Sequence, residues 1–205
     1  MDKNKIKYGL RNVYYAVATI AADGSATFAA PKRIPGAVNL SLDAQGETEP
    51  FYADDIEYYV SVANDGYEGD LEIALVPDDF RTDVLGDFLD ANGVMVEDSD
   101  APVTHFALLF QFAGDVHAKR HVMYNCVATR PSVSGATKEA NITPQTETLS
   151  LSAATIYMPA LEKNVVKARV TPDEAAQYAG WFETVYLPAA PAADPAADPA
   201  ADPET

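Results

Sequence analysis

The stretch GDLEIAL, residues 69–75, alternates between apolar and polar side chains. In an extended chain this alternation places Leu71, Ile73 and Leu75 on one face and the two acidic residues on the other. Three further stretches repeat the pattern: GAVNLSLD at 36–43, IEYYVSV at 56–62 and QTETLSLS at 145–152. Such alternation is typical of antiparallel sheets that have one face on a core and the other in water. It predicts a mainly β fold.

Other stretches are apolar on both faces. VYYAVATI at 13–20 and FALLFQF at 106–112 are predicted to be buried strands, and HVMYNCVA at 121–128 a partly buried one. Turn-forming residues at 63–68 separate the strands at 56–62 and 69–75, so we expect those two strands to form a hairpin. Together these strands predict two packed antiparallel layers or a barrel.

Two segments have helical spacing instead. Residues 77–90, PDDFRTDVLGDFLD, are predicted to form a helix capped by Asp78 or Asp79 and ended by Asn92-Gly93. Residues 171–186 are predicted to form a second helix with Thr171 as its N-cap, Pro172 at its first position and Glu174 completing a capping box, although Gly180 weakens its second half. The fold therefore has one or two short flanking helices.

The chain of 205 residues has a formal net charge of −17, which excludes nucleic-acid binding through a generic basic surface. Residues 1–12 carry four basic residues and one acidic residue, whereas residues 188–205 carry four acidic residues and repeat PAAD three times. We expect a basic arm at 1–12, a β domain at 13–187 and a disordered extension at 188–205.

The sequence gives no positive evidence for catalysis. Asp115, His117 and His121 have ligand side chains, but positions four apart on a strand lie about 13 Å apart, so we favour an exposed rim over a metal site. Cys126 lies among apolar residues, which favours an inert buried thiol and excludes a disulfide framework. No phosphate-binding or nucleophile motif is present, and we expect no cofactor.

Residues 13–22, VYYAVATIAA, follow a basic start and have about the length of a signal-peptide core. Tyr14, Tyr15 and Thr19 are poor residues for such a core, and leucine is absent. We therefore expect a strand here rather than a cleaved signal. The chain also has no run of eighteen apolar residues that would predict a membrane-spanning helix.

Six blocks of sequence together resemble the major tail proteins of long, non-contractile-tailed bacteriophages, especially those that infect Gram-positive bacteria. The blocks are KYGLRNVYYAV (7–17), IPGAVNLSLDAQGETEPFYADDIEYYV (34–60), NDGYEGDLEIALVPDDFRTDVLG (64–86), FALLFQFAGD (106–115), RHVMYNCVATRPS (120–132) and PQTETLSLSA (144–153). The most specific parts surround Phe51-Tyr52-Ala53-Asp54 and Gly66-Tyr67-Glu68-Gly69-Asp70. The resemblance runs from about Lys7 to Tyr186 and leaves out the PAAD repeats.

The resemblance implies a structural, non-enzymatic subunit of the virion tail, assembled in the host cytoplasm. In that family an antiparallel β-sandwich or barrel with a flanking helix forms rings of six subunits, and the rings stack head to tail into a hollow tube. The partners implied are further copies of the chain, the tape-measure protein, and the tail terminator and tail-tip proteins. DNA would only pass through the lumen, and no membrane would be involved.

A DNA-conducting tube needs a polar inner wall that does not bind phosphates. Four acidic residues on the polar faces of the alternating strands are the candidates for this wall: Asp43, Glu57, Asp70 and Glu72. The pattern alone is almost equally compatible with an ordinary solvated outer face.

The connection AQGETEPFYADD at 44–55 is long for a hairpin loop, and we expect it to reach the next ring. The basic arm is expected to do the same, which makes charge pairs between the two segments plausible. The candidate stacking residues are Lys3, Lys5 and Lys7 on the arm and Glu47, Glu49, Asp54 and Asp55 on the connection. Two alternatives remain open: a tube protein of a contractile tail or secretion system, and an exported ligand-binding β-sandwich.

Overall fold

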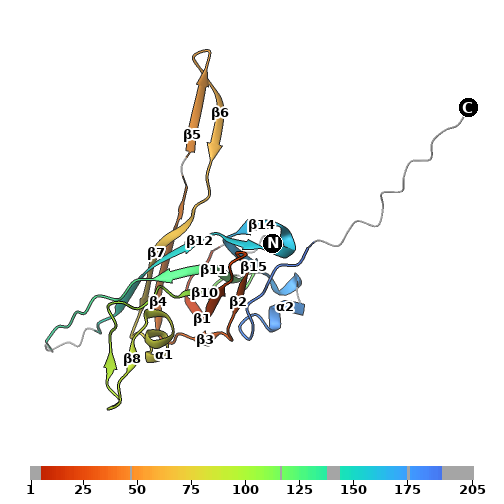
Figure 1. Cartoon of the computed structure of the whole chain (residues 1–205). Helices are drawn as coiled ribbons and strands as arrows, with labels where there is room; N and C mark the ends of the chain where they lie inside the picture. The colour runs from red at the N-terminus through yellow and green to blue at the C-terminus, as the bar shows by residue number, and fades with distance from the viewer. Residues whose placement is uncertain (1–5, 47, 116, 138–143, 175, 191–205) are drawn as a thin grey trace, which may run out of the picture.

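The computed structural model describes residues 6–46, 48–115, 117–137, 144–174 and 176–190. Figure 1 shows a β body, a long hairpin that projects from one end of it, and a shorter hairpin that projects from the other. The strands are β1 (Leu10–Ile20), β2 (Ala26–Phe28), β3 (Lys32–Arg33), β4 (Ala37–Gln45), β5 (Thr48–Ala53), β6 (Ile56–Val62), β7 (Gly66–Ile73), β8 (Phe88–Leu89), β9 (Met95–Val96), β10 (His105–Phe112), β11 (Arg120–Ala128), β12 (Glu147–Ala154), β13 (Ile156–Met158), β14 (Lys163–Val165) and β15 (Lys167–Val170). The helices α1 (Asp78–Phe80) and α2 (Ala176–Ala179) are short, and helical turns at Arg81–Leu85, Pro159–Leu161 and Pro172–Glu174 accompany them.

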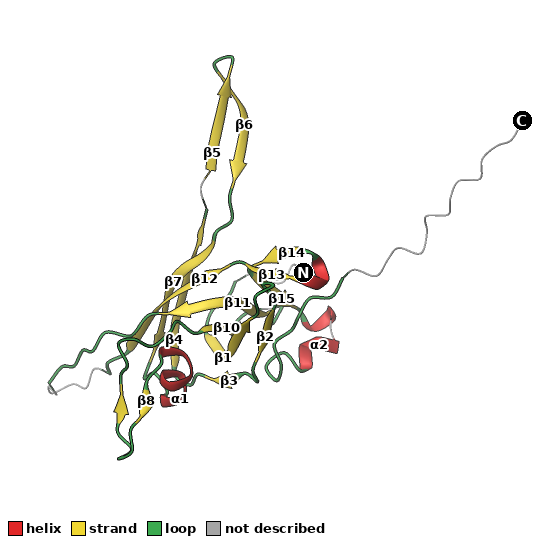
Figure 2. Ribbon diagram, viewed as in Figure 1, coloured by secondary structure: helices red, strands yellow, loops and turns green. Residues whose placement is uncertain are grey.

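One antiparallel sheet of nine strands forms the body, and Figure 2 shows it in yellow. Its strands follow the order β2-β1-β10-β11-β12-β7-β4, with β3 pairing to β1 and β15 pairing to β11. The sheet folds over itself, so that the side chains of its inner face meet in one core. The prediction of a mainly β antiparallel sandwich with short flanking helices is confirmed.

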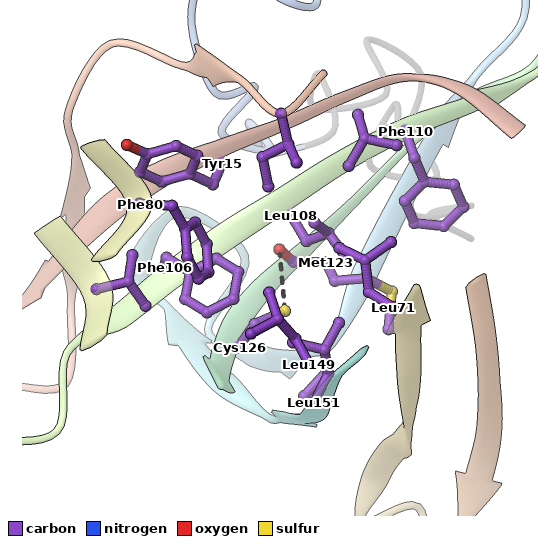
Figure 3. Packing of buried hydrophobic residues seen from close by; sticks show 14 of the residues in the cluster. Tyr15, Leu71, Phe80, Phe106, Leu108, Phe110, Met123, Cys126, Leu149 and Leu151 are labelled. Carbon is purple, nitrogen blue, oxygen red and sulfur yellow. Dashed lines mark hydrogen bonds between the residues drawn. The ribbon is translucent and has the colours of Figure 1, made fainter. Parts of the chain in front are cut away.

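The inner core contains the residues that the alternating pattern predicted. Two strands each contribute two buried leucine or isoleucine side chains beside aromatic side chains of the opposite strands. These are Leu71 and Ile73 from β7 and Leu149 and Leu151 from β12. Figure 3 shows Phe80 of α1 between Tyr15 and Phe106, with ring centroids 4.9 and 5.5 Å apart in edge-to-face contacts. The core therefore extends from the sheet to α1, which closes one end of the body.

A second core covers the outer face of β1, β10 and β11. Trp181 packs there with Tyr124 and Leu109, and its Nε1 donates a hydrogen bond to the backbone oxygen of His121 at 3.3 Å. The Tyr124 hydroxyl donates to the backbone oxygen of Tyr186 at 2.9 Å. Because the C-terminal segment covers this face, β10 and most of β1 and β11 are buried on both sides. The predicted buried strands are confirmed.

The predicted helix at 77–90 is shorter than expected. Its helical turns end at Leu85, because Gly86 adopts a left-handed conformation with φ of 81°. Phe88 then starts β8, which pairs with β9 in an exposed hairpin, so the stop at Asn92-Gly93 is wrong. The capping prediction is wrong as well, because Pro77 precedes α1 and no side chain caps it.

The C-terminal helix is also short. A helical turn starts at Pro172, and α2 extends only from Ala176 to Ala179. Beyond Gly180, the segment with Trp181 and Tyr186 packs on the sheet in turns rather than in the continuous helix predicted for 171–186. Burial of these large aromatic side chains against the sheet outweighs the helical pattern.

The hairpin predicted between 56–62 and 69–75 does not form. β6 pairs with β5, and β7 pairs with β4 and β12. Leu75 lies beyond the end of β7 and is exposed, and so is Val38, beside an irregularity in the β4–β7 pairing. Periodicity identified these strands, but it carries no information on which strand pairs with which.

Candidate functional site

A polar face covers the outer side of β4, β7 and β12. Strand register aligns its side chains in three rows, which are Asn39–Glu72–Thr148, Ser41–Asp70–Ser150 and Asp43–Glu68–Ser152. The Ser150 hydroxyl donates to the carboxylate of Asp70 at 2.7 Å, and the Thr146 hydroxyl donates to Glu72 at 2.6 Å. The polar face thus combines four carboxylates with small hydroxyl and amide side chains and carries no basic residue in these rows.

Three of the four acidic residues predicted for one wall lie together on the polar face: Asp43, Asp70 and Glu72. The fourth, Glu57, lies on β6 in the projecting hairpin, and its side chain falls outside the described residues. Glu68 was missed, although it directly precedes the alternating stretch at 69–75 and could have been found by extending the pattern by one residue. Because β6 does not pair with β7, Glu57 is not part of these rows.

Two glycines allow the strands of the polar face to approach closely. A Cβ at Gly69 would lie 1.9 Å from the carbonyl oxygen of Ser41 on β4, and a Cβ at Gly66 would lie 2.0 Å from that of Ala153 on β12. Gly66 also has φ of +110°, which other residues rarely adopt. The sequence Gly66-Tyr67-Glu68-Gly69-Asp70 is therefore explained by close strand packing.

β4 is an edge strand of the main sheet. It ends the strand order, and among the described residues no strand pairs with its outer edge. In this strand of nine residues, Ala37–Gln45, every second residue thus points its backbone N–H and C=O away from β7, next to the polar face. An edge of this length favours pairing with another chain.

The connection predicted as a loop at 44–55 is largely β structure. β4 extends to Gln45, and β5 and β6 form the long hairpin in Figure 1, which we call the projecting hairpin (Thr48–Val62). Asp54 and Asp55 form its exposed turn, with φ of 52° and 60°. Glu49 lies on β5 with its side chain outside the described residues, and Glu47 lies outside them altogether.

Exposed apolar side chains follow the second strand of the projecting hairpin. Ile56, Tyr58 and Tyr59 are 61%, 72% and 63% exposed. Alternation had predicted that Ile56 and Tyr58 face the core, but the hairpin stands away from the body and provides no core for them. Exposed aromatic and aliphatic residues on a projecting element are typical of a protein–protein contact surface.

The basic arm is described only in part. Lys3 and Lys5 lie outside the described residues. Lys7 lies at the end of the body from which the projecting hairpin leaves, and its Nζ is 4.9 Å from the centre of the Phe112 ring. This position is compatible with the predicted role in stacking, and that role stays a prediction.

The described residues contain no group of three or more metal-binding side chains. Asp115 instead accepts hydrogen bonds from the backbone N–H groups of His117 and Lys119. His121 stacks on Phe110 at 5.1 Å, and burial lowers its pKa to about 4. Cys126 is buried as predicted, and burial raises the pKa of its thiol to about 12.

The family model of the phage tail tube protein matches residues 1–179. The chain belongs to this family. The chain is thus a structural component of the virion tail, where it assembles with copies of itself and with other tail proteins. No curated protein matches its sequence. In the part of the chain that is described, no helix is long and apolar enough to cross a membrane.

Proposed function

We propose that this chain forms hexameric rings that stack head to tail into a hollow conduit for genome delivery, in a long, non-contractile tail. The observation that carries this proposal is the polar face of β4, β7 and β12, backed by the apolar core and bordered by the free edge of β4. A wall of this composition suits the inside of a tube that must not retain DNA.

The polar face is proposed to line the lumen. Its carboxylates Asp43, Glu68, Asp70 and Glu72 repel the phosphates of DNA, and its hydroxyl side chains hold water at the wall. Rings of negative charge repeated along the tube would prevent the polyanion from adhering during passage. The same lumen would hold the tape-measure protein before ejection, and the tail terminator and tail-tip proteins would close the two ends of the tube.

The edge of β4 is proposed to join neighbouring subunits within a ring. Backbone pairing through Ala37–Gln45 would continue the sheet from one subunit to the next and would bring the polar faces together as one wall. The projecting hairpin would contact the next ring through Ile56, Tyr58 and Tyr59, with Asp54 and Asp55 near the basic arm of a neighbour.

Electron microscopy of the purified protein tests the proposal. We expect rings and tubes, and a protein that remains monomeric at high concentration would contradict it. The contribution of the arm is measured by deleting residues 1–7. We expect the deletion to slow tube assembly and to reduce its dependence on salt, because exposed ion pairs are screened. If the rate of tube assembly and its salt dependence are unchanged, the arm does not take part in the stacking contact.

A further inference from the structure

A cationic, aromatic pocket opens at the end of the body from which the projecting hairpin leaves. We call this cavity of about 180 Å³ the cationic pocket. Its lining includes Lys7, Tyr67, Phe112, His121 and Lys167. A neighbouring hollow shares Lys7, Phe112 and His121 and adds two cationic residues, Lys119 and Arg169. These cations gather on a chain whose net charge is −17, so the patch is unlike the rest of the protein.

Aromatic rings hold the two lysines at the pocket. Lys167 Nζ lies 4.3 Å from the centre of the Tyr67 ring and donates a hydrogen bond to its hydroxyl at 2.5 Å. Lys7 Nζ lies 4.9 Å from the centre of the Phe112 ring. No salt bridge neutralises either lysine among the described residues. Asp115 lines the neighbouring hollow, where its carboxylate accepts hydrogen bonds from two backbone N–H groups and forms no salt bridge with a described lysine. The pocket therefore offers positive charge together with apolar surface.

The opposite end of the body carries the complementary chemistry. Residues 78–100 contain eight acidic residues and one basic residue. Within this segment the short hairpin of β8 and β9 exposes Phe88, Leu89 and Val96, which are 50%, 60% and 36% exposed. Figure 1 shows β8 and α1 at the end of the body away from the projecting hairpin. The eight residues of β10 separate the two ends, from His105 near the acidic segment to Phe112 at the cationic pocket.

We infer that the cationic pocket receives the β8–β9 hairpin of a second copy of the chain, with Phe88 as the inserted side chain. This inference rests on the proposed stacking of rings and assigns the residues of one contact between them. A cavity of about 180 Å³ is large enough for an aromatic ring, since a 150 Å³ cavity admits benzene. The carboxylates of the acidic segment then face the lysines around the pocket mouth, and the Phe88 ring lies between cations that favour an aromatic face.

Placement at opposite ends fixes the kind of assembly. A contact between two different surfaces of the same chain is heterologous and repeats without closing when the surfaces lie on opposite ends. The contact between the cationic pocket and the β8–β9 hairpin therefore joins subunits of successive rings along the tube axis. The edge of β4 joins subunits within a ring. Complementary charge gives the stack its polarity, because two cationic pockets facing each other would repel.

Cysteine cross-linking of assembled tubes tests the inference. The double variant Phe88→Cys/Lys167→Cys is treated with a short bis-maleimide, while the native Cys126 is buried and does not react. We expect a ladder of covalent oligomers that continues beyond the size of one ring. The matched control is Phe88→Cys/Lys163→Cys, since Lys163 is exposed but does not line the pocket, and it should give no ladder.

The outcomes separate the inference from the function on which it rests. If tubes assemble but the Phe88→Cys/Lys167→Cys variant gives no ladder, or gives products no larger than one ring, the inference is overturned. The proposed tube function is not affected by that result. Wild-type protein that forms no tubes overturns the proposed function. A second measurement uses Lys167→Glu, which should raise the concentration needed for tube assembly about 10-fold, while Lys163→Glu should not change it. An equal effect of both substitutions would also contradict the inference.

Discussion

Gly69 offers the sharpest test of how strand packing supports assembly. Gly69 lies in the middle of β7, opposite Leu42 on β4 and Leu151 on β12. In a Gly69→Ala variant the new Cβ would lie 1.9 Å from the carbonyl oxygen of Ser41 and 2.8 Å from its carbonyl carbon. Because both atoms belong to the backbone, no side-chain rotation relieves the clash, and β4 must move away from β7.

The cost follows from overpacking, which typically destabilises a protein by about 1–3 kcal/mol. In a domain of this size each kcal/mol lowers the melting temperature by about 2–4 °C, so we expect a fall of about 2–12 °C. Displacement of β4 also disturbs the edge proposed to join neighbouring subunits. We therefore expect Gly69→Ala to form no tubes under conditions where the wild-type protein does.

The assay is thermal unfolding of the unassembled subunit, followed by electron microscopy of assembly reactions. Gly135→Ala is the matched control, because a Cβ there meets no atom within 4 Å. We expect it to melt within about 2 °C of the wild-type protein and to form tubes. If Gly69→Ala melts and assembles like Gly135→Ala, the close approach of β4 and β7 does not exist in the protein.

Three further predictions concern the wall, the C-terminus and pH. Replacing Asp43 and Asp70 with lysine should leave tubes intact but slow DNA ejection, because cations on the lumen wall attract phosphates. The control Asp173→Lys, at an exposed position outside the polar face, should not slow it, and equal ejection rates would count against a lumenal polar face. Removing residues 188–205 should change the melting temperature by less than about 2 °C and preserve tube assembly, because PAAD repeats contain little apolar surface to bury; a larger fall would show that they pack on the body. Burial lowers the pKa of His121 from 6.5 to about 4, so the unfolded chain binds the proton more readily and stability is lost as pH falls from about 6.5 to 4. The melting temperature of unassembled His121→Leu should therefore decrease less over this interval than that of the wild-type protein, and an identical decrease would refute this role.

The sequence predicted the strands better than their partners. Alternation at 69–75 and 145–152 identified β7 and β12, because their apolar residues face one core. The same alternation misplaced Ile56 and Tyr58, since a projecting hairpin shows the period of a strand without a core beneath it. Only the register of the folded sheet shows that β7 lies between β4 and β12.

The candidate wall was predictable for a related reason. Asp43, Asp70 and Glu72 occupy the polar positions of alternating strands, and strands that pair in register bring those positions together. The cationic pocket was not predictable, because Lys7, Tyr67 and Lys167 are far apart in the sequence and carry no shared pattern. The end of the helix at Gly86 was not predicted, although glycine is a common helix stop. The apolar residues Phe88 and Leu89 continue the helical spacing beyond it and favoured a longer helix.

A cryo-electron microscopy map of tubes assembled from the full chain tests the central claim most directly. At side-chain resolution it locates the polar face of β4, β7 and β12 relative to the tube axis. We predict that Asp43, Glu68 and Asp70 face the channel in every subunit, with β4 paired to a neighbour in the same ring. A map in which these carboxylates lie on the outer surface of the tube would contradict the account.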